Sequence, residues 1–157
     1  MSKEPTIWID GDGAPKSCKE TVFKASGRTG VSVVLVANRA QAVPRIPSVQ
    51  LVQVGSGLDV ADDHIADHCQ PGDLVITSDI PLAARVIEAG GTVIQFRGEP
   101  LTEANTRQRL AMRDFMDELR GSGVMTGGPA GYGPKDKQRF ANALDRWLSK
   151  AVRASSA

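Results

Sequence analysis

The sequence of 157 residues predicts an α/β protein, a three-layer α/β/α sandwich with a mainly parallel sheet of about five strands. Short runs of strand-forming residues alternate with helix-like segments between residues 6 and 97, the pattern of strand–helix–strand units. The run at 31–37 is almost continuously apolar and β-branched, as in strands buried on both faces of a parallel sheet. A hydrophobic fraction of 41% is that of an ordinary globular protein.

The expected elements follow one another with short connections. Pro15 opens the first helix, and the pair Gly90-Gly91 closes the third. From Thr102, which we expect to cap a helix, a helical C-terminal region replaces the alternation and packs on the same domain, 1–157. The predicted strands are 6–10, 31–37, 49–54, 73–79 and 92–97, and the predicted helices are 15–28, 58–69, 81–89, 102–120 and 135–153.

Composition narrows the classes of function. A formal charge of +1 gives the whole protein no large field toward nucleic acid or membrane, so a polyanion would have to meet a local patch. No segment approaches the ~20 apolar residues of a membrane span, and the first residues lack a signal-peptide pattern. We therefore expect a cytoplasmic protein with no membrane association. Cys18 and Cys69 are too far apart for a C-x-x-C site, and we expect both to be buried.

Carboxylates follow three of the predicted strands. The carboxyl ends of parallel strands meet at one edge of a sheet, so these side chains are expected to converge there. A shared cation site is predicted from Asp10, Asp12, Asp79 and one of Asp62 or Asp63, because adjacent helix positions diverge by about 100°. Oxygen-only ligands favour Mg²⁺ or Mn²⁺. Asp59, taken alone, is interpreted as a helix cap.

Candidate substrate contacts lie near these carboxylates and on the C-terminal helices. Thr77 is placed to position a water or a ligand, or equally to serve the strand itself. Arg113 and Lys135 are candidate phosphate contacts, although basic helix faces are often only solvated. An acidic pocket beside a basic rim is what metal-dependent cleavage of a phosphodiester needs.

The same residues resemble the YaiI/YqxD family of bacterial proteins, which belongs to the PIN-like group of folds. The match covers nearly the whole chain in order. Its pieces are Ile9-Asp10-Gly11-Asp12 with Pro15, residues 36–39 including Asn38, residues 59–65 and 72–83, Asn105 and Arg113, and Gly128-Pro129 ahead of Asp136 and Phe140. The family's usual D-A-D-A-C-P opening is here Asp10-Gly11-Asp12-Gly13-Ala14-Pro15, which lacks the cysteine.

The resemblance implies a PIN-like sandwich, and PIN nucleases use clustered acidic residues to hold Mg²⁺ or Mn²⁺ and cut RNA. It implies a ribonuclease acting on single-stranded RNA, with Asn38 as a further candidate substrate contact. Carried over residue by residue, the acidic cluster would be Asp10, Asp12, Asp62, Asp63 and Asp79.

Two other interpretations stay open. Asp10 and Asp12 form a D-x-D after a strand, as in a haloacid-dehalogenase-like phosphatase, with Asp10 as nucleophile and Asp12 as acid. Against it, Ala37-Asn38 stands where a Ser or Thr is expected, and no cap domain is evident. The other is a PIN-like module that binds RNA or a protein without catalysis.

Overall fold

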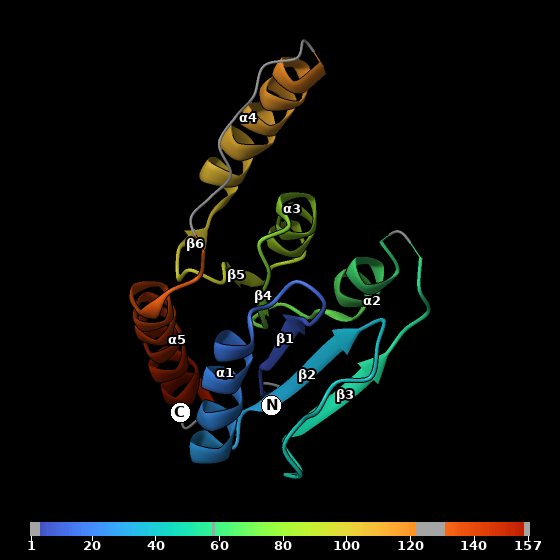
Figure 1. Ribbon diagram of the computed structural model, residues 1–157. Helices are drawn as coiled ribbons and strands as arrows, with labels where there is room; N and C mark the ends of the chain where they lie inside the picture. Colours follow the sequence, from blue (N-terminus) through green and yellow to red (C-terminus); the bar gives the residue numbers. More distant parts are fainter. Residues whose placement is uncertain (1–3, 58, 122–130, 156–157) are drawn as a thin grey trace.

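The chain forms one six-stranded sheet flanked by helices, which confirms the predicted α/β class (Figure 1). The computed structural model describes residues 4–57, 59–121 and 131–155. The strand order is β3-β2-β1-β4-β5-β6, with every neighbouring pair parallel except β5 and β6. The strands are β1 (Thr6–Asp10), β2 (Ser32–Ala37), β3 (Val49–Gln53), β4 (Leu74–Ile76), β5 (Thr92–Ile94) and β6 (Pro100–Leu101).

The sixth strand was not anticipated. β6 has two residues, too few to give a periodic pattern, and it begins with Pro100. Proline has no amide hydrogen to donate, so this residue is confined to the edge of a sheet, where β6 lies.

The five helices fall where the sequence predicts them, with boundaries that differ by a residue or two. Each predicted helix is confirmed, including both of the C-terminal region. They are α1 (Lys16–Thr29), α2 (Val60–His68), α3 (Ile80–Glu88), α4 (Glu103–Gly121) and α5 (Pro134–Ser155).

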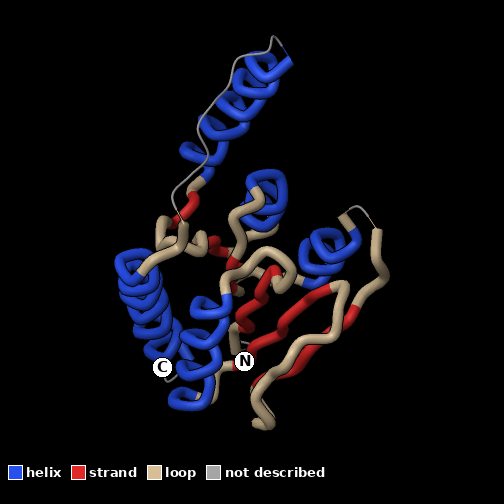
Figure 2. Tube along the Cα trace, in the orientation of Figure 1, coloured by secondary structure: helices blue, strands red, loops and turns tan. Residues whose placement is uncertain are grey.

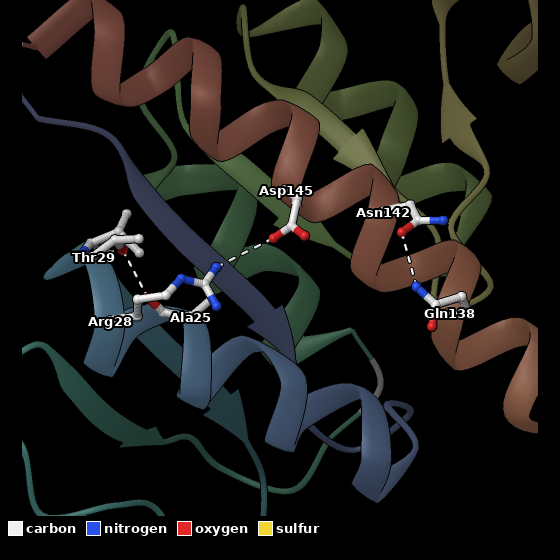
Figure 3. Close-up of polar contacts among 7 residues, drawn as sticks. Ala25, Arg28, Thr29, Gln138, Asn142 and Asp145 are labelled. Carbon is white, nitrogen blue, oxygen red and sulfur yellow. Dashed lines mark hydrogen bonds and ion pairs between the residues drawn. The ribbon is translucent and has the colours of Figure 1, made fainter.

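Helices α1 and α5 lie on one face of the sheet and α2 and α3 on the other, and they make the outer layers of a sandwich (Figure 2). On one face α1 and α5 bury Val22 and Phe140 against the strands, and on the other α2 and α3 bury Ile65 and Val86. Arg28 of α1 reaches Asp145 of α5 with a 3.3 Å ion pair at the surface (Figure 3). Cys18 and Cys69 are both buried and unpaired, as expected.

Helix α4 packs on α3 and extends away from the sheet (Figure 1). Its start confirms the predicted cap, because the amide of Asn105 donates to Thr102 Oγ1 at 3.2 Å. Met112 and Phe115 are more than half exposed along it. Within the described ranges, no helix is long and apolar enough to cross a membrane.

A buried carboxylate that the sequence analysis did not single out fixes the start of β1. The Asp73 side chain is 4% exposed and accepts hydrogen bonds from the amides of Thr6 and Gln70 and from Trp8 Nε1, at 2.9–3.0 Å. These bonds join the beginnings of β1 and β4 to the end of α2. A carboxylate satisfied by three donors is a structural group, which distinguishes Asp73 from the aspartates at the opposite edge.

The strand order reverses at β1, which has β2 on one side and β4 on the other. Helices on either side of such a reversal leave a crevice outside the carboxyl ends of the strands, where open α/β sheets bind their ligands. Asp10 ends β1, and Asp79 follows β4 by three residues. The fold therefore delivers both predicted site residues to this crevice.

Candidate acidic site at the strand reversal

A pocket of about 230 Å³ lies at this edge and is lined mainly by carboxylates. They come from three segments far apart in the sequence: the loop after β1, the start of α2 and the loop after β4. The lining residues are Asp10, Asp12, Asn38, Gly55, Gly57, Asp59, Ala61, Asp62 and Asp79.

Thr77 connects the end of β1 with the end of β4. Its hydroxyl donates to Asp10 Oδ2 at 3.0 Å and accepts from the amide of Asp79, also at 3.0 Å. Asp79 in turn caps α3, because its Oδ1 accepts from the amide of Leu82 at 2.9 Å. The Thr77 side chain is fully buried, so the structure gives it the task of holding the Asp10 carboxylate and the backbone of Asp79 in place.

The turn after β1 fixes the second aspartate. Asp12 Oδ2 accepts from the backbone amide of Asn38 at 2.9 Å, which ties the turn to the end of β2. Gly11 stands between the two aspartates because the chain passes very close to β2: a Cβ there would lie 2.8 Å from a Leu35 methyl carbon and 3.0 Å from the Val36 carbonyl oxygen. Any larger residue at position 11 would push the two carboxylates away from β2.

Helix α2 contributes two more carboxylates. Asp62, in its first turn, is half-buried in the pocket. Asp59 sits at the N-cap position with φ of 64°, but its side chain makes no capping hydrogen bond. The interpretation of Asp59 as a side-chain cap is therefore wrong in this respect, and the residue lines the pocket instead. Aspartate is among the residues that tolerate this left-handed conformation.

Asp63 is not brought together with the other carboxylates. It is exposed, and its Oδ1 lies 2.7 Å from Arg85 Nη1 on α3. The same guanidinium lies 3.8 Å from Asp67, one turn further along α2. The structure thus separates Asp62, which lines the pocket, from Asp63, which joins α2 to α3 at the surface.

The other predicted substrate contacts differ in their relation to the pocket. Lys135 is exposed in the first turn of α5 and does not line it. The backbone of Arg113 belongs to α4, but its side chain is outside the part of the chain that the structure describes, as is the glycine-rich stretch 122–130. Asn38 is the one predicted substrate contact that lines the pocket with an accessible side chain.

The carboxylates in the pocket repel one another. Burial raises the pKa of Asp10, and the neighbouring charges of Asp79 and Asp12 raise it further, against the hydrogen bond from Thr77. Burial together with the charges of Asp79, Asp10 and Asp59 raises the pKa of Asp62 to about 6. A hydrogen bond with the Asp79 side chain adds a smaller contribution, because it favours the protonated form of Asp62.

These shifts predict how the stability of the metal-free protein depends on pH. The pKa of Asp62 is about 6 in the folded chain and about 3.9 in an unfolded one, so the folded state holds more protons between these values. The favourable contribution of Asp62 is present below about pH 4 and is lost as the pH rises through about 6. We expect an Asp62→Asn variant to gain stability relative to the wild type over this range, measured by urea unfolding in a chelator. A relative stability that does not change with pH would contradict the raised pKa of Asp62, and Asp63→Asn serves as the control.

The donor set of the pocket fits a hard divalent cation, because every charged ligand is a carboxylate oxygen. A cation would also offset the burial and the mutual repulsion that raise the pKa of Asp10 and Asp62. Among residues 4–57, 59–121 and 131–155, however, no three Asp, Glu, His or Cys side chains are arranged as a ready-made metal site. Bringing three carboxylates to one cation therefore requires side-chain movement within the pocket.

The fold and the pocket define a class: an α/β sandwich with an acidic crevice where the strand order reverses. Comparison with known proteins identifies the family within this class. A family model described as "Uncharacterized BCR, YaiI/YqxD family" matches residues 8–150, and the chain belongs to this family. No solved structure matches the chain.

Curated relatives cover almost the entire chain and carry the name "UPF0178 protein". One from Psychromonas ingrahamii is 53% identical over 96% of this chain and 99% of its own length. One from Myxococcus xanthus is 52% identical over 94% of this chain and 96% of its own. One from Xanthomonas oryzae pv. oryzae is 48% identical over 96% and 94%.

Proposed function

We propose that the acidic pocket binds Mg²⁺ or Mn²⁺ and that the protein is a metal-dependent phosphodiesterase acting on RNA in the cytoplasm. The observation that carries the proposal is the convergence of Asp10, Asp62 and Asp79 on one pocket from three separate segments, where burial and then the neighbouring charges raise the pKa of Asp10 and Asp62. Keeping such like charges together is unfavourable without a counter-ion. The resemblance to PIN nucleases supports RNA as the substrate class.

The residues have distinct tasks in this proposal. Asp10, Asp62 and Asp79 hold the cation, and Asp12 completes the pocket beside them. A divalent cation at this position supplies a water of lowered pKa and neutralises charge on the leaving oxygen. Thr77 keeps Asp10 and the backbone at Asp79 in register through its two hydrogen bonds. Asn38 lines the rim, where an amide can donate to a phosphate oxygen.

Thermal unfolding with and without Mn²⁺ tests the first step. A ligand that binds only the folded state stabilises it by about 2.7 kcal/mol at a hundred times its dissociation constant. For a domain of this size, that corresponds to an increase in Tm of roughly 5–10 °C. We expect this shift in millimolar MnCl₂ relative to EDTA, and its loss in an Asp10→Asn variant.

The outcomes separate the alternatives. No Mn²⁺-dependent shift would contradict the proposal and favour a module without catalysis. A shift accompanied by turnover of a small phosphomonoester and a trapped acyl phosphate on Asp10, without RNA cleavage, would support the phosphatase instead. Cleavage of a labelled single-stranded RNA that requires Mn²⁺ is the result expected for the proposed enzyme.

A further inference from the structure

A second concave surface lies between the β5–β6 turn and α5, and its charge is opposite to that of the acidic pocket. This arginine groove has a volume of about 490 Å³ and is lined by three guanidinium groups and two carboxylates, together with an amide and a glycine. Its charged and polar residues are Arg97, Arg139, Arg146, Asp136, Glu99 and Asn142.

Both carboxylates of the groove are already paired with arginines. Asp136 Oδ2 lies 2.9 Å from Arg97 Nη1 and also accepts from the amide of Gly133, and these contacts hold the pKa of Asp136 below its usual value. Glu99 forms an ion pair with Arg109 from α4. The ion pairs of these acidic side chains are therefore made with Arg97 and Arg109, although the nearby charge of Arg139 also helps to lower the pKa of Asp136.

Arg139 and Arg146 supply the net positive charge of the groove. Both are exposed, and among the described residues neither has a carboxylate within 4 Å. They are seven residues apart on α5, which places them two turns and about 10 Å apart on one side of the helix, with Asn142 between them. On the same helix the Asn142 amide oxygen accepts from Gln138 (Figure 3), which leaves the amide hydrogens of Asn142 for another acceptor.

The β5–β6 turn of the arginine groove leaves the sheet at the edge that carries the acidic pocket, and α5 continues the groove away from this turn. β5 is parallel to β4, so the turn that follows β5 leaves from the edge that carries Asp10 and Asp79. Neighbouring strands are about 4.8 Å apart, which puts the end of β5, where the turn begins, roughly 10 Å from the end of β1. A polymer of phosphodiesters can span this distance and continue along α5.

Phe96 lies between the two surfaces. A Cβ on Gly13 would be 3.6 Å from the Phe96 ring and 3.7 Å from Asp10 Oδ2, so the half-buried ring borders the acidic pocket. Its backbone carbonyl accepts a hydrogen bond from the Tyr132 hydroxyl at 2.8 Å. The next residue along the chain is Arg97 of the groove. An aromatic ring in this place offers a stacking surface for an unpaired base.

The turn itself is held firmly against α5. Gly98 has φ of 89°, and a Cβ there would lie 2.5–2.7 Å from the backbone of Arg139 and Phe140. Only glycine permits this conformation and this approach, so the groove is formed by packed backbone and not by long side chains alone.

From these observations we infer that the arginine groove binds the phosphate backbone of single-stranded RNA that extends from the acidic pocket past Phe96. The path of the strand rests on the proposed function, but the binding does not. Guanidinium groups favour phosphate because their fork of N–H donors matches two phosphate oxygens. The place of Phe96, near Asp10 and next to Arg97 in the chain, favours nucleic acid over an acidic peptide.

The test measures binding of a labelled single-stranded RNA of about twelve nucleotides by fluorescence anisotropy in EDTA, where a metal-dependent enzyme does not cut. We expect Arg139→Glu/Arg146→Glu to weaken binding at least tenfold. For two lost phosphate contacts, the slope of log affinity against log salt concentration should fall by about 1.4. The neutral pair Arg139→Gln/Arg146→Gln should weaken binding less, and it keeps the test valid if charge reversal impairs folding.

The matched control is Lys24→Glu/Arg45→Glu, which changes the net charge equally at exposed positions outside the groove. It should bind RNA as the wild type does. Equal affinity of the groove variants and the wild type would overturn the inference, as would an equal loss in the control. Displacement of the RNA by a polyglutamate peptide of the same length would also overturn it, because it would point to an acidic protein segment.

Failure of the groove and failure of the proposed function give different results. If Mn²⁺ supports no RNA cleavage but the groove variants still lose binding, the groove stands and the phosphodiesterase does not. If RNA is cleaved and the groove variants bind and cleave like the wild type, the proposed phosphodiesterase stands and the inference about the groove does not.

Discussion

Replacing Asp10 by asparagine is expected to reduce Mn²⁺-dependent cleavage of single-stranded RNA by at least about 10²–10³-fold, as when one group that stabilises transition-state charge is removed. Asp10 ends β1 at the strand reversal and shares the pocket with Asp62 and Asp79. An amide keeps the shape of the side chain but removes one of the charges that attract a cation. The measurement is the rate of cleavage of an end-labelled RNA over a range of Mn²⁺ concentrations.

The stability of the same variant separates loss of function from loss of fold. Because burial and the charges of Asp79 and Asp12 raise the pKa of Asp10, its charged form is unfavourable in the folded protein at neutral pH. The asparagine side-chain oxygen can still accept the hydrogen bond from Thr77. We therefore expect the metal-free variant to be at least as stable as the wild type in urea unfolding. Full cleavage activity in a folded variant would refute the role of Asp10.

The fold was predictable because its strands carry strong local signals. The apolar run that forms β2 is buried at five of its six positions, which is what the pattern of a doubly covered parallel strand implies. The convergence of Asp10 and Asp79 was also predictable, because topology alone takes the ends of parallel strands to one edge. Neither inference required knowledge of any side-chain contact.

The parts that were not predictable depend on contacts between segments distant in the sequence. Asp73 resembles the other aspartates near strand ends, yet two donors from β1 and one from the turn after α2 make it structural. The arginine groove combines the β5–β6 turn with the middle of α5, a pairing that no local pattern records. The place of Asp59 before a helix predicts a side-chain cap. Its backbone is left-handed, with φ of 64°, and its side chain makes no capping hydrogen bond.

Asp62 and Asp63 are adjacent, and the sequence alone did not show which of them faces the pocket. Helical geometry implies that the two side chains diverge, but it cannot say which one faces the pocket. The answer comes from α3, because Arg85 pairs with Asp63 at 2.7 Å and Asp62 is left facing Asp79. The two residues therefore form a matched pair for mutation, with the same chemistry and the same helix but different surroundings.

We expect Asp62→Asn to lower Mn²⁺-dependent cleavage by at least about 10²-fold and to reduce the Tm increase that Mn²⁺ produces, since it removes a pocket charge. Asp63→Asn should keep cleavage within about twofold and cost about 0–1 kcal/mol of unfolding free energy, because its ion pair with Arg85 is exposed. Cleavage rates and thermal unfolding of the two variants, measured side by side, check both statements. If Asp63→Asn lost activity while Asp62→Asn kept it, the cation site would have to involve the α2–α3 surface in place of the pocket at the strand reversal.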